Sequence, residues 1–454
     1  MKKIVAMGAA VALAASMFAA EPAANTSVVS FTGNASVEWG VDLDSKKTGF
    51  ENATWTEFKA KLFDAGDKST SGSGDVWAEL VLKVDDDSSV GPNGYVDGHW
   101  IGSKDDGSDY KNDGKAAYID VAKFHFGDFY IGIKSGDTQV GELDLNTALR
   151  STGFWANNGR WLAAVGTNYT QGIVAGYANG NLEVNVDFRS DAHYTNNYAM
   201  AAEVALKDSN EFVNGLAVKA GFAYCFKEED YAYSASTAYK VAIDDKFYVK
   251  PAVGMTGKKA SAGAKATDTM KVAGTVLFGW GDTNGYGSVG LPYFTDDSSR
   301  GMTPGVSVSF AKSLAKDSEI VIVPAFYLGD LVENMKAAAY AEIGIPSSGD
   351  SAMAIGAGVG YDVKADDLTI TPKFACRYEN KAYAGDLSPN VDSNAKANMF
   401  AQKTAGAEYF DVTASVDVAG LINNTTFTVE YVSGNLKADT AEKGTVNVRA
   451  KISF

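Results

Sequence analysis

The chain has 454 residues, of which 46% are hydrophobic, and it carries a formal net charge of −16. This acidic balance excludes a nucleic-acid partner, because phosphate groups would be repelled. No apolar run of the sequence reaches the roughly 18 residues that a transmembrane helix needs, so the chain could cross a membrane only as a closed β-barrel.

The composition favours many strands joined by turns. The sequence has 47 Gly, 22 Tyr and 23 Phe against 9 Pro. Its mean hydropathy of −0.12 fits an alternation in which lipid-facing and water-facing side chains average out. A secreted all-β solenoid or sandwich is the alternative that composition leaves open.

Residues 1–20 have the pattern of a cleaved secretion signal. Met1, Lys2 and Lys3 form a short cationic start, and the apolar run 4–15 that follows is too short to span a bilayer. We expect cleavage after Ala20, which leaves residues 21–454 as one exported domain. Alternation from Ala35 onward favours one continuous barrel over a separate N-terminal periplasmic region.

Alternation of apolar and polar side chains predicts about 20 antiparallel strands in an up-and-down transmembrane β-barrel. The predicted strands cover residues 35–43, 52–63, 75–84, 115–126, 129–134, 161–169, 172–178, 182–189, 198–207, 215–225, 231–241, 246–256, 268–280, 303–311, 319–328, 351–363, 368–379, 405–418, 424–433 and 444–454. Gly127-Asp128 and Asn179-Gly180 predict two tight hairpins. Segments 285–294 and 335–345 are too rich in Gly and Ala to be counted.

The lengths of the connections predict which end of the barrel faces outward. Outer-membrane barrels place short turns in the periplasm and long loops outside, and counting starts inside with the N-terminus. The strand list then puts five long segments outside, namely 85–114, 135–158, 281–302, 329–350 and 380–404. It puts three short segments inside, namely 227–230, 364–367 and 419–423, while 64–74 and 257–267 are long for inner turns.

The two cysteines are predicted to face opposite sides of the wall. Cys225 falls on the polar parity of its strand and Cys376 on the apolar parity. Side chains on opposite faces of one wall cannot meet, so no intramolecular disulfide is expected.

The last stretch of the chain, 444–454, predicts the strand that closes the barrel and signals its insertion. Its lipid-facing parity includes Val448, Ala450, Ile452 and Phe454. A terminal aromatic ring suits the lipid–water interface, where barrel strands carry an aromatic girdle.

Charges of both signs fall on the polar parities of the predicted strands. They are Glu38, Asp42, Glu79, Lys83, Glu183, Asp187, Arg189, Lys373, Arg377, Glu379, Arg449 and Lys451. Such charges require water or partners, and a barrel of about 20 strands is too wide for side chains to fill. We therefore predict that these residues line an aqueous pore of weak ion selectivity.

No catalytic, cofactor or metal site is expected, and we predict that the protein is not an enzyme. His99, His125 and His193 show no metal-ligand spacing, and neither a Gly-x-Ser-x-Gly elbow nor a phosphate-binding loop occurs. Four aspartates in the first long loop, Asp105, Asp106, Asp109 and Asp113, have the ligand chemistry for Ca²⁺. Their spacing misses the EF-hand pattern, so a solvated acidic loop is favoured.

Both ends of the chain resemble the major surface proteins, or major outer sheath proteins, of treponemes, which are spirochaetes. The resemblance rests on residues 31–44 (FTGNASVEWGVDLD) after the signal and on the terminal strand 446–454. It implies an outer-membrane, cell-surface location, pore formation and adhesion to host extracellular-matrix proteins.

Three functions compete on this sequence. They are a porin, an adhesin whose plugged barrel only displays loops, and a secreted non-membrane β protein. For the first two, the expected partners are outer-membrane lipid and the barrel-assembly machinery, with host extracellular-matrix proteins and a homo-oligomer as further candidates.

Overall fold

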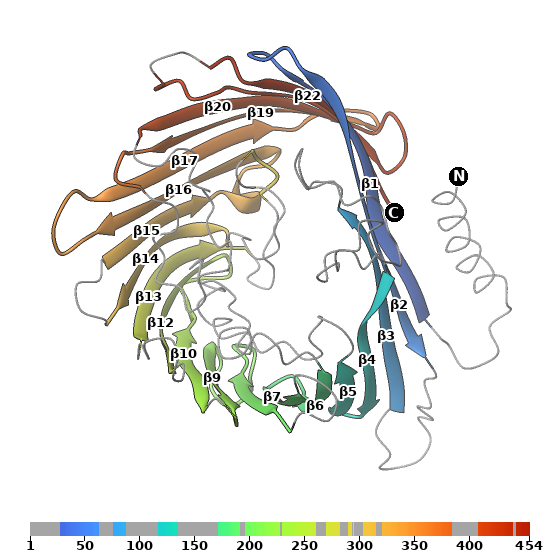
Figure 1. Cartoon of the computed structure of the whole chain (residues 1–454), viewed down its shortest axis with the longest axis vertical. Helices are drawn as coiled ribbons and strands as arrows, with labels where there is room; N and C mark the ends of the chain where they lie inside the picture. Colours follow the sequence, from blue (N-terminus) through green and yellow to red (C-terminus); the bar gives the residue numbers. More distant parts are fainter. Residues whose placement is uncertain are drawn as a thin grey trace, which may run out of the picture.

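The protein is a closed antiparallel β-barrel in its computed structural model (Figure 1). The structure describes residues 28–62, 76–87, 117–134, 171–190, 196–227, 229–259, 269–281, 289–292, 294, 303–314, 320–383, 407–438 and 442–454. One sheet holds 22 labelled strands. Strands β11 and β18 continue β10 and β17 along the same partners, so the wall has 20 strand positions.

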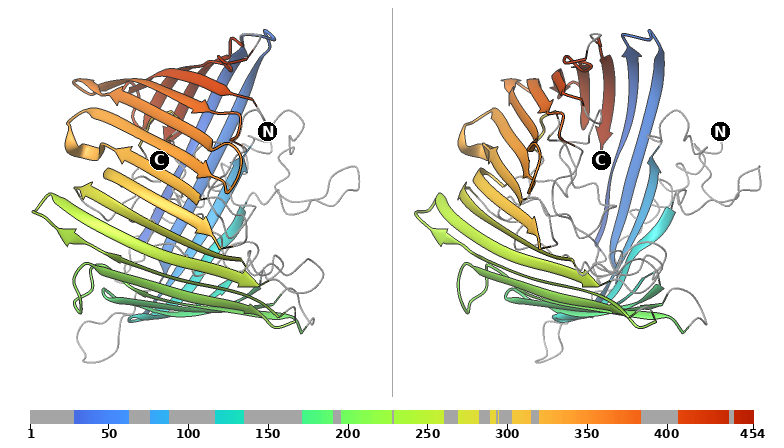
Figure 2. Two further views of the ribbon diagram at one scale, coloured as in Figure 1. Left: turned by 90° about the vertical axis from the view of Figure 1, so that its left-hand side faces the viewer. Right: turned by 60° about the vertical axis from the view of Figure 1, so that its left-hand side comes forward.

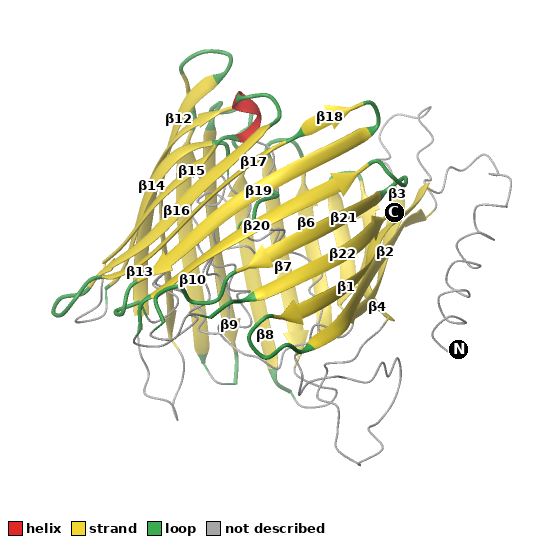
Figure 3. Cartoon of the chain, turned by 90° about the horizontal axis from the view of Figure 1, so that it is seen from above, coloured by secondary structure: helices red, strands yellow, loops and turns green. Residues whose placement is uncertain are grey.

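The strands run obliquely around the barrel and are steeply inclined to its axis, as the side views show (Figure 2). Their bounds are β1 (Val28–Asp42), β2 (Thr48–Leu62), β3 (Val76–Asp87), β4 (Ala117–Phe126), β5 (Phe129–Lys134), β6 (Gln171–Ala178), β7 (Leu182–Ser190), β8 (Tyr198–Leu206), β9 (Leu216–Cys225), β10 (Asp230–Tyr239), β11 (Val241–Ala242), β12 (Phe247–Lys259), β13 (Thr269–Trp280), β14 (Gly305–Ser313), β15 (Ile320–Tyr327), β16 (Met335–Ile345), β17 (Ala352–Tyr361), β18 (Val363–Ala365), β19 (Leu368–Glu379), β20 (Tyr409–Ala419), β21 (Thr425–Val432) and β22 (Thr445–Ser453). In the described residues, helix is limited to the short 3-10 turn η2 (Gly329–Leu331), seen in red in Figure 3.

The last strand closes the barrel against the first. β22 pairs with both β21 and β1. At the seam the Gly33 N–H donates to the Phe454 carbonyl at 2.7 Å, and the Phe454 N–H donates to the Gly33 carbonyl at 2.9 Å. The Phe454 ring also stacks on Phe31, with centroids 5.2 Å apart. Closure leaves no free sheet edge, and the predicted closing strand is confirmed.

The two predicted tight hairpins are confirmed. Phe126 pairs with Phe129 across Gly127 and Asp128, and Gly127 adopts a φ of 60°, which glycine tolerates without strain. In the second hairpin Ala178 pairs with Glu183 and the Asn179 N–H donates to the Leu182 carbonyl, so the two turn residues are Gly180 and Asn181, one position later than predicted. Both turns lie at the end of the barrel where β1 starts and β22 finishes, which we name the terminal end; the opposite end is the distal end.

A third turn at the terminal end is stabilised by an acidic side chain. The carboxylate of Asp244 accepts hydrogen bonds from the N–H groups of Phe247 at 2.7 Å and Lys246 at 2.8 Å. These bonds favour the ionised carboxylate and hold the pKa of Asp244 below its usual value.

The predicted strand number is right, but one member of the list is wrong. Residues 335–345, which we excluded, form β16 between β15 and β17. The predicted strand 161–169 lies outside the described residues, and β5 pairs directly with β6, so no strand separates them in the wall.

This exchange corrects the predicted sides of several connections. The prediction counts one strand too many near residue 165, so it assigns every later connection to the wrong end of the barrel. The omission of β16 from the prediction cancels this error for the connections that follow β16. The long segment 281–302 therefore leaves from the terminal end, and 227–230 lies at the distal end, contrary to prediction. Segment 329–350 is not a loop, because it contains β16. The predicted loops 85–114, 135–158 and 380–404 fall largely outside the described residues, as does the whole of the predicted signal.

The two cysteines are free thiols on opposite faces of the wall, as predicted. Cys225 is fully buried on the parity of Lys219, whereas Cys376 shares the parity of the exposed Phe374.

Candidate functional site

The described wall is apolar outside and polar inside. Successive side chains of a strand face opposite sides of the wall, so each strand contributes one set to the lumen. The outward parity exposes large hydrophobic side chains, for example Val37, Trp39, Phe124, Ile173, Phe188, Phe222, Val276, Val308, Ile355, Phe374, Val416 and Val448. The inward parity buries polar and charged side chains, for example Asn185, Asp187, Arg189, Glu203, Lys219, Lys250, Ser309, Glu342, Arg377, Glu379 and Asp411. A protein surrounded by water shows the reverse, so this outer surface suits lipid.

On β7 to β9, inward charges neutralise one another. The guanidinium of Arg189 donates to the carboxylate of Asp187, and both side chains are almost fully buried. Lys219 on β9 lies 2.8 Å from Glu203 on β8. Glu183 accepts a hydrogen bond from Asn185 at 3.2 Å. Partners therefore replace the water that these charges would otherwise need.

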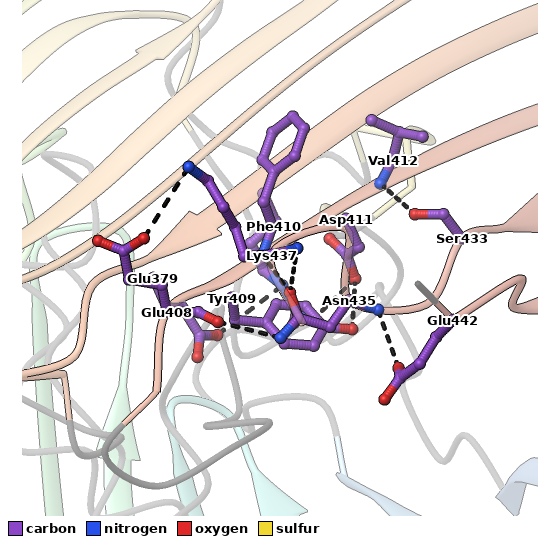
Figure 4. Close-up of polar contacts among 11 residues, drawn as sticks. Glu379, Glu408, Tyr409, Phe410, Asp411, Val412, Ser433, Asn435, Lys437 and Glu442 are labelled. Carbon is purple, nitrogen blue, oxygen red and sulfur yellow. Dashed lines mark hydrogen bonds and ion pairs between the residues drawn. The ribbon is translucent and has the colours of Figure 1, made fainter. Parts of the chain in front are cut away.

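A second group of buried charges lies on β19 and β20, near the distal end. Arg377 Nη2 lies 3.0 Å from Asp411 Oδ2, and its Nε lies 3.8 Å from Glu379 Oε1. The Tyr409 hydroxyl donates to Asp411 at 3.1 Å, and the ring of Tyr409 lies 4.9 Å from the guanidinium. Figure 4 shows Tyr409 and Asp411 beside the chain that follows β21.

Asn435 organises the distal rim beside this group (Figure 4). Its side-chain oxygen accepts hydrogen bonds from the N–H groups of Phe410 at 3.1 Å and Lys437 at 2.9 Å. Its amide nitrogen donates to the carbonyl of Glu408 at 3.0 Å. One buried side chain thus satisfies three backbone groups where the ladder between β20 and β21 ends.

The third group, on β2 to β5, is more open. Lys59 lies 2.7 Å from Glu79, and the Lys59 side chain is 54% exposed. His125 stacks on Trp77 with ring centroids 3.7 Å apart and lies 3.6 Å from Glu79. Lys61 lies 4.8 Å from the centre of the Trp77 ring. This wall combines cations and aromatic faces on one surface.

The remaining residues of the predicted pore lining are spread around the wall. Glu38 and Arg449 lie 3.8 Å apart across the closing seam, and the Arg449 side chain is 44% exposed. Lys373 lies 2.5 Å from Asp417. Asp42 is exposed at the distal end of β1, Lys451 is half-buried, and the side chain of Lys83 lies outside the described residues.

Strands β15 to β17 differ from the rest because their inward parity is also apolar. Val321, Val323, Ala338 and Ala354 are buried there in one cluster. The same cluster contains Val289, Leu291 and Phe294, which belong to the connection between β13 and β14, and Tyr383, which follows β19. Chain from both ends of the barrel therefore packs against one sector of the wall.

Within the described part of the chain, no group of three or more His, Cys, Asp or Glu side chains is arranged to hold a metal ion. The acidic loop with Asp105 and Asp113 lies outside that part. No helix among the described residues is long and apolar enough to span a membrane.

Two curated proteins are similar to this chain along its whole length, although no protein-family model matches it. The major outer membrane protein MspA of Treponema maltophilum is 27% identical, with 100% of both chains covered. The major surface protein MspTL of Treponema lecithinolyticum is 25% identical over 99% of this chain and 96% of that protein. The chain is a homologue of the treponemal major surface proteins. The resemblance noted at the chain ends is confirmed over the full length.

Solved structures with a similar barrel include OpdQ of Pseudomonas aeruginosa, which is 10% identical with a TM-score of 0.41 and covers 94% of this chain and 98% of its own. OccAB3 of Acinetobacter baumannii is 9% identical with a TM-score of 0.39, covering 93% and 99%. The treponemal homologues and the apolar outer surface place this protein in the outer membrane, at the cell surface.

Sequence reasoning missed the apolar sector of this protein's inner wall. The signal was present, because β15 and β16 read IVIVPAFY and MKAAAYAEIGI, with almost no alternation. A strand that is apolar on both faces indicates packing on both faces. We excluded 335–345 for its Gly and Ala content, although its lack of alternation pointed to chain packed inside the barrel.

Proposed function

We propose that the protein is a porin, a passive water-filled channel for small hydrophilic solutes. The observation that carries the proposal is a closed wall of 20 strand positions whose inward parity bears charges of both signs. Barrels of about 8 strands are filled by their own side chains, and the diameter grows roughly linearly with strand number. A wall of this width encloses more space than its side chains occupy.

Hydrogen-bonding geometry supports water inside the barrel. Within the described residues, Asn185 Oδ1 and Ser236 Oγ are buried on the inward parity and have no hydrogen-bond partner in the protein. Buried polar atoms are almost always paired with protein or with water. Water in the lumen would satisfy both atoms.

Single-channel recording in a planar bilayer tests the proposal. Purified, refolded protein should give discrete conductance steps, and the same protein after boiling should give none. The folded state is verified first by a heat-dependent shift in gel mobility. Folded protein that enters the bilayer without any conductance step would contradict the porin and favour a plugged barrel.

The second proposal is adhesion to host extracellular-matrix proteins through the distal end. Three of the longest connections leave from that end, namely 88–116, 135–170 and 380–408, and the resemblance to treponemal surface proteins motivates the ligand class. Deletion of 88–116 should lower binding of intact cells to immobilised matrix proteins without lowering conductance. Unchanged binding after deletion of each long connection in turn would contradict this proposal.

A further inference from the structure

The apolar sector holds an insert of the chain, defined here as residues 289–294 with residue 293 outside the described part. Val289, Leu291 and Phe294 are 3%, 0% and 5% exposed. The insert belongs to the connection between β13 and β14, which leaves from the terminal end. Its apolar side chains face the inner surface of β15 to β17.

The wall is shaped to receive Leu291. β17 carries Gly358 and Gly360 on its inward parity, directly opposite this side chain. A Cβ atom added at Gly360 would lie 3.1 Å from Leu291 Cδ2, and one at Gly358 would lie 3.4 Å from Leu291 Cδ1. Larger residues at either position would press on the insert, so the two glycines allow close approach.

The packing continues along the height of the wall. Tyr383, from the chain after β19, is buried in the same cluster near the distal end. Its hydroxyl donates to Glu342 Oε2 at 2.8 Å, and the Tyr340 hydroxyl donates to Glu342 Oε1 at 2.8 Å. The single carboxylate within this sector is therefore occupied by two phenols rather than presented to the lumen.

We propose that the insert is a fixed constriction that seals the β15–β17 sector, so that solutes pass beside it along the charged sectors. This inference rests on the proposed porin function. Leu291 and Phe294 are then the residues that anchor the insert to the wall and so keep the constriction in place. The path remains lined by the open group on β2 to β5 and by the pairs on β7 to β9 and β19 to β20.

A designed disulfide tests where the insert lies, independently of conductance. A Cβ atom at Gly358 would lie 3.5 Å from the Leu291 Cβ, which is within the separation that a disulfide requires. The pair L291C/G358C is introduced into a background with Cys225→Ala and Cys376→Ala. Oxidation should close the disulfide in folded protein. If it does not form in heat-modifiable barrels, the placement of the insert is wrong, whether or not the protein conducts.

Conductance then tests whether the insert is a constriction and whether it is fixed. The disulfide-bonded (locked) form and the reduced form of L291C/G358C should have equal unit conductance, because a fixed insert does not move. L291S/F294S should raise the unit conductance and let larger sugars enter proteoliposomes. The control is L421S, which removes an exposed leucine from a turn at the terminal end. If the double variant does not fold, L291A replaces it.

Two results would overturn the constriction. One is a difference between the locked and reduced forms, which would show a moving gate. The other is an unchanged conductance and sugar limit in a folded L291S/F294S or L291A. A disulfide that forms in a protein without conductance would instead reject the porin and leave the insert in place.

Discussion

At the scale of single residues, burial decides which charges depend on partners. Arg377 is 4% exposed and lies between two carboxylates. Arg449 is 44% exposed, lies 3.8 Å from Glu38 and interacts electrostatically with Glu430. A buried charge that loses its partner keeps its desolvation cost, whereas an exposed charge is solvated by water. The two arginines should therefore respond very differently to truncation.

Arg377→Ala should lower the free energy of unfolding by about 3 to 5 kcal/mol, because it leaves Glu379 and Asp411 buried without their cation. The matched control Arg449→Ala should cost about 1 kcal/mol or less. Urea unfolding in lipid vesicles, followed by tryptophan fluorescence, measures both. Equal losses in the two variants would contradict the assignment.

Exposure also predicts which inward charges affect ion selectivity. Lys59→Glu should shift the reversal potential in a salt gradient towards cation selectivity, because Lys59 is 54% exposed. Glu342→Gln should leave it unchanged, because Glu342 is 2% exposed and its carboxylate accepts hydrogen bonds from the Tyr340 and Tyr383 hydroxyls. The Lys59→Glu shift should shrink at high salt, since charges are screened beyond about 8 to 10 Å near physiological ionic strength. A clear effect of Glu342→Gln would place that residue in the solute path.

At the scale of single elements, the closing strand β22 has two separable roles. It seals the seam with β1, and we predict that it also signals insertion to the assembly machinery. Deletion of Phe454 should lower the amount of barrel in the outer membrane, measured by heat-modifiable protein in membrane fractions. Phe454→Tyr should restore it, because the ring remains. Normal insertion of the deletion variant in cells would refute the signal.

The segment after β21 should depend on Asn435. Asn435→Ala leaves the N–H groups of Phe410 and Lys437 and the carbonyl of Glu408 without this partner, at a cost of about 1 to 3 kcal/mol. Ser433→Ala, which removes one acceptor from Val412, should cost less. The comparison is made by urea unfolding. A Ser433→Ala loss as large as that of Asn435→Ala would mean that Asn435 does not organise this rim.

At the scale of the whole molecule, strand pairing fixes which connections reach the cell surface. Both termini of an outer-membrane barrel lie on the periplasmic side, so the terminal end is periplasmic. Epitope tags within 88–116 and 384–404 should be stained on intact cells. A tag within 282–288 should be stained only after permeabilisation, because Trp280 and Gly305 flank it at the terminal end. Surface staining of that tag would invalidate the corrected topology.

Much of this fold follows from local pattern. The period of two along a strand reports which side chains meet lipid, so the strands around Leu182 and Val448 and the opposite faces of Cys225 and Cys376 could be predicted from sequence. Turn chemistry identified the hairpins at Gly127 and Asn179 for the same reason, since the turn residues act on adjacent backbone.

Tertiary structure alone decided which parts of the chain pack on the inner face of β16 and which charged side chains form pairs. The segment 335–345 lacks alternation because Leu291 and Tyr383, distant in sequence, pack on its sector of the inner wall. Arg377 and Asp411 lie 34 residues apart and meet only because β19 and β20 are neighbours. The sequence determined which side chains of most strands face lipid and which face the lumen, because this depends only on the alternation of side chains along each strand. It did not determine the contents of the lumen, because packing inside a closed wall joins residues that no local pattern relates.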